Sequence, residues 1–103
     1  MHSEKKKFLK RYLILEAKIS RYRHMAFLDP RRKKNYESLI LQADISRREI
    51  EEKIYSVEDE LLIELLFQKY ILGKTLEEIS GILNYSKRHI ERLHIKALEK
   101  IDV

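Results

Sequence analysis

Two apolar stripes, separated by the Leu-Asp-Pro of residues 28–30, constrain the fold of this chain more than any other feature. Their members recur at alternating spacings of three and four: Phe8, Tyr12, Leu15, Ile19, Tyr22 and Ala26 in the first, and Tyr36, Ile40, Ala43, Arg47, Ile50, Ile54 and Val57 in the second. This spacing places the apolar residues on one face of a helix. It predicts one helix over about 3–26 and another over about 30–55, with Asp29 as the cap of the second and Pro30 at its first position. Two long helices joined by a short loop pair as an antiparallel hairpin.

The second half of the chain predicts three shorter helices. Ser56 reads as the cap of a helix over 57–72 that ends at Gly73. Its expected buried face consists of Leu61, Leu62, Leu65, Leu66, Tyr70 and Ile71. Thr75 and Glu78 form a capping box for the next helix, which ends at Asn84, and Ser86 caps a last helix that runs to about Ile101. The expected fold is therefore all-α: a helical hairpin, coiled-coil-like, over 1–55 and a tri-helical helix-turn-helix domain over 56–103.

Composition supports helices and excludes several classes of function. The chain has only two Gly and one Pro, few for a sheet with many tight turns, and it has no Cys for disulfides or thiolate zinc sites. No apolar run is long enough for a membrane span, and we expect a soluble cytoplasmic protein. The sequence shows no nucleophile–base constellation and no Gly-rich phosphate loop, which favours a protein that is not an enzyme and needs no cofactor. His89 and His94 are five residues apart and so do not share the helix face that a metal site needs.

The segment over 75–101 has the pattern of a DNA-binding helix-turn-helix. Such a corner needs a small residue where the helices cross, which Ser80 supplies, and a residue that tolerates a left-handed backbone in the turn, which Asn84 supplies. The residues expected to fill the corner are Ile79, Leu83, Tyr85, Ile90 and Leu93. The polar residues of the last helix then face outward, where Arg and Lys suit guanine edges and phosphates. An ordinary helical corner with a solvated polar face is the alternative interpretation of the same spacing.

The stretch YSKRHIERLHIKALEKI resembles the promoter-reading helix of bacterial sigma factor region four: a hydroxyl cap, basic residues, an Ile and a Lys-Ala-Leu ending. The stretch YILGKTLEEISGILNYS resembles the segment that precedes that helix, and the likeness covers about 57–101. The whole layout is also similar to small phage transcriptional regulators of the ArpU type, through Tyr85, Ser86, Arg88, His89, Leu93 and His94. This resemblance implies a phage or prophage regulator that acts on late genes.

If the DNA-contacting positions of these families are transferred to this sequence, the resemblance implies a DNA-binding surface on the last helix. It consists of Ser86, Lys87, Arg88, Glu91, Arg92 and Lys96. Sigma factors often have an acidic residue at the position of Arg88 and a basic one at that of Glu91, so their minus-35 preference is not expected here. The 103 residues contain no match to the other sigma regions, and a complete sigma factor is therefore not expected.

Charge is divided unevenly along the chain and suggests further partners. Residues 1–34 carry 12 Lys/Arg and 3 Asp/Glu, residues 35–72 carry 4 and 9, and residues 73–103 carry 6 and 5. The basic runs 5–7 and 31–34 would lie at opposite ends of the hairpin, either as solvated ends or as phosphate contacts. The acidic residues Glu58, Asp59, Glu60 and Glu64 either favour a helix dipole or form a docking face for RNA polymerase.

Three alternatives remain open at this stage. The hairpin stripes could form a homodimer instead of packing only on each other, which would suit half-sites one DNA turn apart. The chain could be a phage small terminase-like DNA recognition subunit, which would form larger rings. It could also be a sigma-like module that binds RNA polymerase without touching DNA.

Overall fold

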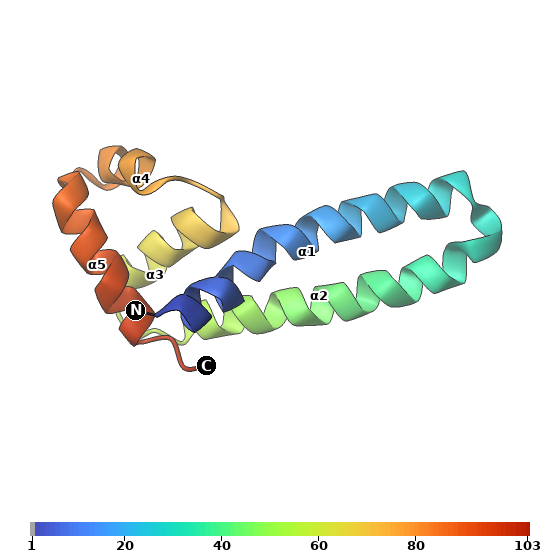
Figure 1. The fold of residues 1–103 in the computed structure, drawn as a ribbon, viewed down its shortest axis with the longest axis horizontal. Helices are drawn as coiled ribbons and strands as arrows, with labels where there is room; N and C mark the ends of the chain where they lie inside the picture. Colours follow the sequence, from blue (N-terminus) through green and yellow to red (C-terminus); the bar gives the residue numbers. More distant parts are fainter. Residues whose placement is uncertain (1) are drawn as a thin grey trace.

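The computed structural model describes residues 2–103, and in this range the chain is helical with no strand. The α-helices are α1 (Ser3–Leu28), α2 (Lys33–Tyr55), α3 (Glu60–Leu66), α4 (Leu76–Leu83) and α5 (Lys87–Glu99). A 3₁₀ turn, η1 (Pro30–Arg32), precedes α2, and a π-helical stretch, η2 (Phe67–Ile71), follows α3. The predicted all-α fold is confirmed. Its long hairpin projects from the region formed by α3, α4 and α5, giving a body of 52 × 26 × 23 Å (Figure 1).

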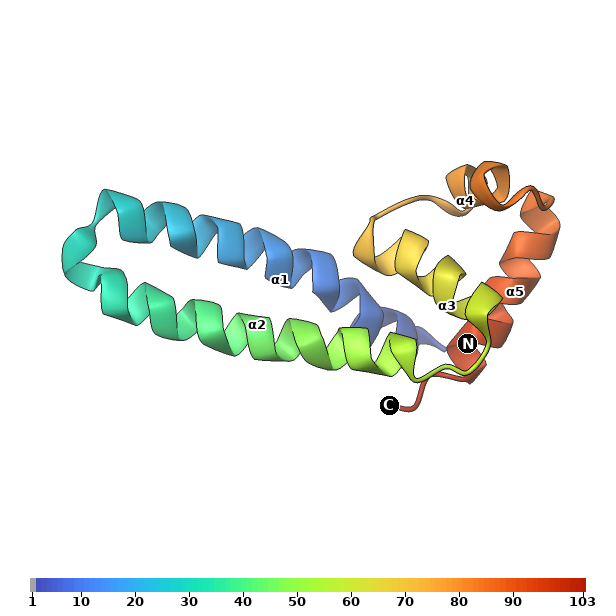
Figure 2. The ribbon, with the colours of Figure 1, turned by 180° about the vertical axis from the view of Figure 1, so that it is seen from behind.

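α1 and α2 form the antiparallel hairpin that the two stripes predict (Figures 1 and 2). The buried residues of the pair are Leu9, Tyr12, Leu15 and Ile19 from α1, and Ala43, Ile50 and Ile54 from α2. Arg47 interrupts the second stripe, and its guanidinium pairs with carboxylates of both helices, at 3.2 Å from Glu16 and 2.6 Å from Asp44. The one charged member of the stripe therefore has acidic partners where an apolar residue would have packed.

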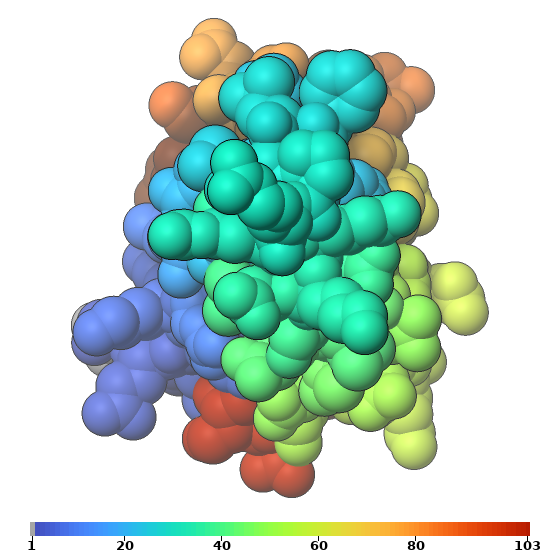
Figure 3. Space-filling view, turned by 90° about the vertical axis from the view of Figure 1, so that its right-hand side faces the viewer, coloured from blue at the N-terminus to red at the C-terminus, as the bar shows by residue number. Residues whose placement is uncertain are grey.

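The tip of the hairpin differs in detail from the prediction. α1 continues to Leu28, and Pro30 begins a 3₁₀ turn before α2 starts at Lys33. Asp29 makes no side-chain capping hydrogen bond, so its predicted role as a cap is wrong. Its carboxylate lies 3.8 Å from the side chain of Arg32 instead. Figure 3 looks onto this tip, whose long side chains project from the end of the molecule. The basic runs 5–7 and 31–34 lie at opposite ends of the hairpin, as expected.

The segment between the hairpin and α3 shows that the predicted cap of α3, Ser56, is wrong. Ser56 ends α2, where its hydroxyl donates to the carbonyl of Lys53 at 2.8 Å. Asp59 caps α3 instead, accepting from the backbone N–H groups of Leu61 and Leu62 at 3.0 and 3.3 Å. A carboxylate at this position satisfies two donors that the first helical turn leaves free. Residues 57 and 58 are therefore outside the helix.

The expected α-helix over 57–72 also changes its hydrogen bonding before it ends. Over η2 the backbone widens to a π-helix, and the N–H of Leu72 donates to the carbonyl of Phe67 at 3.0 Å. Gly73 then adopts a left-handed conformation with φ of 75°, as its predicted position after the helix requires. Of the predicted buried face, Leu61 and Ile71 are only half-buried, whereas the other four members are buried.

A single hydrophobic cluster connects the hairpin to the rest of the molecule. It includes Leu9 of α1, Ile54 of α2, Leu62 of α3 and Leu98 of α5, together with Ile101 just after α5. A second cluster holds Leu65, Ile79 and Ile90 at the junction of α3, α4 and α5. The hairpin is thus packed against α5 through the main core.

Candidate nucleic-acid interface

α4 begins with the capping box that the sequence predicts. The hydroxyl of Thr75 accepts from the N–H of Glu78, and the carboxylate of Glu78 accepts from the N–H of Thr75, both at 3.1 Å. The hydrogen bond from the backbone N–H of Thr75 to the ionised carboxylate is the main reason that the pKa of Glu78 lies below its usual value, and the side chain of Thr75 and the charge of Lys74 lower it further. The start of α4 is therefore fixed by local chemistry.

The turn between α4 and α5 has the geometry expected for a helix-turn-helix. Asn84 adopts the left-handed conformation, with φ of 60° and ψ of 37°, which reverses the chain direction after α4. Ser86 then caps α5, its hydroxyl accepting from the N–H of His89 at 3.1 Å. The helix ends at Glu99, two residues earlier than predicted.

The inner face of α5 packs as predicted, but one residue expected to fill the corner before it does not. Ile90, Ala97 and Leu98 are fully buried and Leu93 is half-buried. Tyr85, which was expected to fill the corner, is 41% exposed, so that part of the prediction is wrong. Its ring lies against His89, with 4.9 Å between ring centroids, on the outside of the turn.

His94 is a buried polar residue that the sequence reasoning missed. Its Nε2 lies 2.6 Å from the hydroxyl of Tyr70, which pairs the two side chains inside the core. Burial is the main reason that the pKa of His94 falls to about 4, and Lys69, Lys6 and Lys10 lower it further. Burial also raises the pKa of Tyr70. The signal was present in the sequence, because His94 is four residues after Ile90 and three before Ala97.

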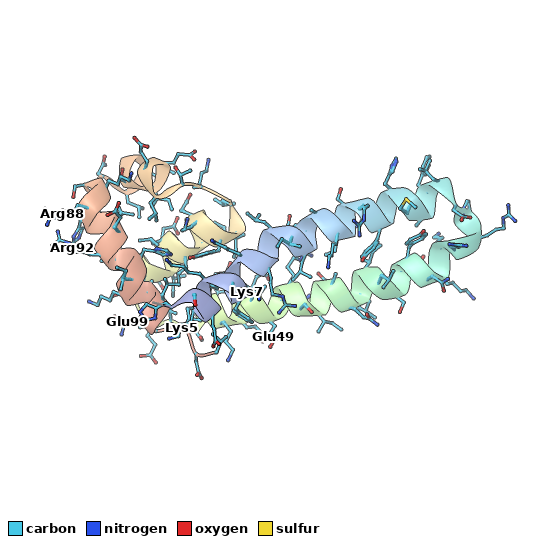
Figure 4. All side chains as sticks on the ribbon, viewed as in Figure 1. Lys5, Lys7, Glu49, Arg88, Arg92 and Glu99 are labelled. Carbon is cyan, nitrogen blue, oxygen red and sulfur yellow. The ribbon has the colours of Figure 1, made fainter. Side chains whose placement is uncertain are left out.

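All six residues proposed for the DNA-binding surface are exposed to solvent. They are Ser86, Lys87, Arg88, Glu91, Arg92 and Lys96, with Ser86 at the cap and the others along α5. Figure 4 shows Arg88 and Arg92, one turn apart, projecting away from the body. Ile95, 48% exposed, continues this face one turn further on. Lys87 and Glu91 lie on the flank of the helix and line a groove together with residues of α1.

The basic side chains on the outer face of α5 form no ion pairs within the described part of the chain. The ion pairs found in residues 2–103 join other residues, and none involves Lys87, Arg88 or Arg92. The far end of α5 is held by α1, where Lys5 donates to the carbonyl of Glu99 at 3.3 Å (Figure 4). The helix is anchored at both ends while its basic side chains stay available.

Comparisons with known proteins identify no family for this chain. No protein-family model matches the chain, and neither the curated proteins nor the solved structures gave a significant match. In residues 2–103 no helix is long and apolar enough to cross a membrane. The same residues contain no group of three His, Asp or Glu side chains arranged to hold a metal ion.

Proposed function

We propose that this protein is a sequence-specific double-stranded DNA-binding regulator of transcription that inserts α5 into the major groove. The observation that carries the proposal is the Asn84 turn followed by a Ser86-capped helix. The outer face of this helix presents Arg88 and Arg92, which form no ion pairs among residues 2–103. After this turn the second helix packs its inner face on the core and leaves its outer face in solvent, as a reading helix requires.

The chemistry of the outer face fits base edges and phosphates. Arg88 and Arg92 can each donate two parallel hydrogen bonds to guanine, and Glu91 can accept from the amino group of cytosine. Ser86, Lys87 and Lys96 lie toward the two ends of the helix, where contacts to phosphate set its register. The exposed Ile95 offers an apolar contact to a thymine methyl group.

The proposal extends to a biological setting through the sequence resemblance to sigma region four and to ArpU-type regulators. In that setting the protein acts on late genes of a phage or prophage, in the cytoplasm, near RNA polymerase. The hairpin also has exposed apolar residues, among them Ile14, Leu41 and Ile45, which could pack in a homodimer. A dimer would read two half-sites about one helical turn apart.

Selection from a random duplex library at physiological salt tests the function directly. We expect one enriched motif, whose symmetry reports whether a monomer or a dimer binds. Uniform recovery would mean binding through phosphates alone. Failure to recover any duplex would contradict the proposal and favour the module that binds a protein such as RNA polymerase. Ring-sized oligomers in solution would favour the terminase-like subunit.

Substitutions on α5 test the assigned face. Arg88→Ala and Arg92→Ala should each weaken binding to the selected site by about 1–3 kcal/mol and relax preference at one position of the motif. Arg21→Ala is the matched control, since Arg21 is an exposed arginine on α1 that lies outside the helix-turn-helix. Wild-type affinity in both α5 variants would show that DNA is read by another surface.

A further inference from the structure

A groove of about 610 Å³ lies where the hairpin meets the helix-turn-helix. Its walls come from α1, η2, the 73–75 segment and the first turns of α4 and α5. Four lysines line it, each from a different part of the chain: Lys10, Lys69, Lys74 and Lys87. Glu77 and Glu91 are the acidic residues in its lining. The groove therefore combines charges that the sequence places as far apart as residues 10 and 91.

The lysines of the groove form no ion pairs within the described part of the chain, although Glu77 and Glu91 share the groove and the charge of Lys74 helps to lower the pKa of Glu78. Within residues 2–103 no carboxylate oxygen lies within 4.0 Å of any of the four amino groups. Lys69 is half-buried, and its amino group lies 5.6 Å from the ring centroid of Tyr70. Burial lowers the pKa of Lys69, and the nearby charges of Lys10 and Lys6 lower it further. Like charges held together in this way are relieved by a bound anion.

The position of the groove relative to α5 suggests which anion it holds. Lys87 opens α5 and Glu91 follows one turn later on the same flank, so the groove borders the N-terminal half of the helix. When a helix lies in the major groove of DNA, the phosphate backbone passes along its flanks. Lys10 and Lys69 extend the basic surface from this flank toward the hairpin.

We propose that this lysine groove holds the phosphate backbone of the duplex beside the base pairs that α5 reads, with Lys10 of the hairpin and Lys69 of η2 as contacts from outside α4 and α5. The inference rests on the proposed function and adds a role for the hairpin. α1 then is part of the DNA interface near its start, whereas the basic run 31–34 at the tip is remote from it.

Salt dependence provides the first test. Each phosphate contact contributes about 0.9 to the slope of log affinity against log salt. Lys10→Gln should therefore weaken binding to the selected site and reduce the slope by about 0.9, so that raising salt from 50 to 200 mM weakens the variant about 3.5-fold less than the wild type. The base preference should not change, because a phosphate contact carries no sequence information. Lys69→Gln should show the same loss of affinity, the same reduction of the slope and an unchanged base preference.

The matched control is Lys18→Gln, which removes the same charge from the same helix outside the groove. It should retain the wild-type slope. Lys10 is exposed, so its replacement leaves the core intact, and circular dichroism of each variant verifies folding. A wild-type slope in both groove variants, with specific binding preserved, would overturn the groove assignment and leave the proposed function standing.

Directed cleavage provides a second, positional test. The chain has no cysteine, so Lys10→Cys carries a single attachment point for an iron chelate that cuts nearby DNA. Cleavage of the selected duplex at the edge of the motif is the expected result, and Lys18→Cys should cut weakly or elsewhere. If the wild type binds no duplex specifically, both proposals fail. If inorganic phosphate binds at Lys10 and Lys69 while duplex cleavage is absent, the groove is a small-anion site and the inference is wrong.

Discussion

Acid should destabilise this protein through His94, well above the pH at which carboxylates are protonated. His94 is only 5% exposed, and its pKa is lowered from 6.5 to about 4. Between these two values the unfolded chain binds a proton at His94 that the folded chain does not. The free energy of unfolding therefore falls as pH decreases from about 6.5 toward about 4.

The size of the effect follows from the shift. A pKa lowered from 6.5 to about 4 corresponds to about 3.4 kcal/mol in the free energy of unfolding, and about 2 kcal/mol of this is lost by pH 5. Lys69, Lys6 and Lys10 supply part of the shift from partly solvated positions, where water and salt screen them. We expect a loss of about 1–2 kcal/mol between pH 7 and pH 5.

The assay is urea unfolding of the wild type and of His94→Gln at several pH values. Glutamine keeps a polar group near the hydroxyl of Tyr70 but does not titrate. The variant will be less stable at pH 7, and its stability should then change little down to pH 5. The difference between the two profiles isolates His94 from the other histidines. Parallel profiles would refute the reasoning, because they would mean that a proton on His94 is tolerated in the folded state.

The remaining predictions concern the turn and the core. Asn84→Ala should lower the free energy of unfolding by about 1–2 kcal/mol, because alanine lacks the short polar side chain that lets asparagine tolerate a φ of 60°. Asn84→Gly should be nearly neutral, because glycine adopts this conformation freely. Equal losses in thermal unfolding would argue against a left-handed turn. Leu9→Ala should lower the free energy of unfolding by about 2–5 kcal/mol, because Leu9 is fully buried in the main cluster. Ile14→Ala, at an exposed position on the same helix, should lower it far less. Similar unfolding midpoints for the two variants would contradict the packing described.

The sequence predicted those parts of the fold that depend on local rules. Thr75 with Glu78, Asn84 and Ser86 each act through hydrogen bonds or dihedral angles that involve residues two to four positions away, and all were assigned correctly. The alternating stripes of the hairpin were correct for a similar reason, since each face follows from helical spacing alone.

The errors arose where competing candidates or distant contacts decide the structure. Ser56 and Asp59 are both residues that cap helices well. In the structure the carboxylate of Asp59 caps α3, and Ser56 ends α2. The π-helical widening at Phe67–Ile71 has no periodic signature in the sequence. The groove of Lys10, Lys69 and Lys87 could not be found from spacing, because its residues come from α1, η2 and α5, which are far apart in the sequence.

The packing of α1 against the last turn of α5 also affects the order in which the molecule can be completed. The main cluster joins Leu9 to Leu98 and Ile101, so residues near the two extremes of the sequence share one core. During synthesis the first helix leaves the ribosome long before these partners exist. α1 and α2 can pack together once residue 55 has left the ribosome. Leu9 is fully buried only after residues 98 and 101 have been made and have packed against it. The helix proposed to read DNA is thus made after the hairpin and α3, and its arrival closes the core around Leu9.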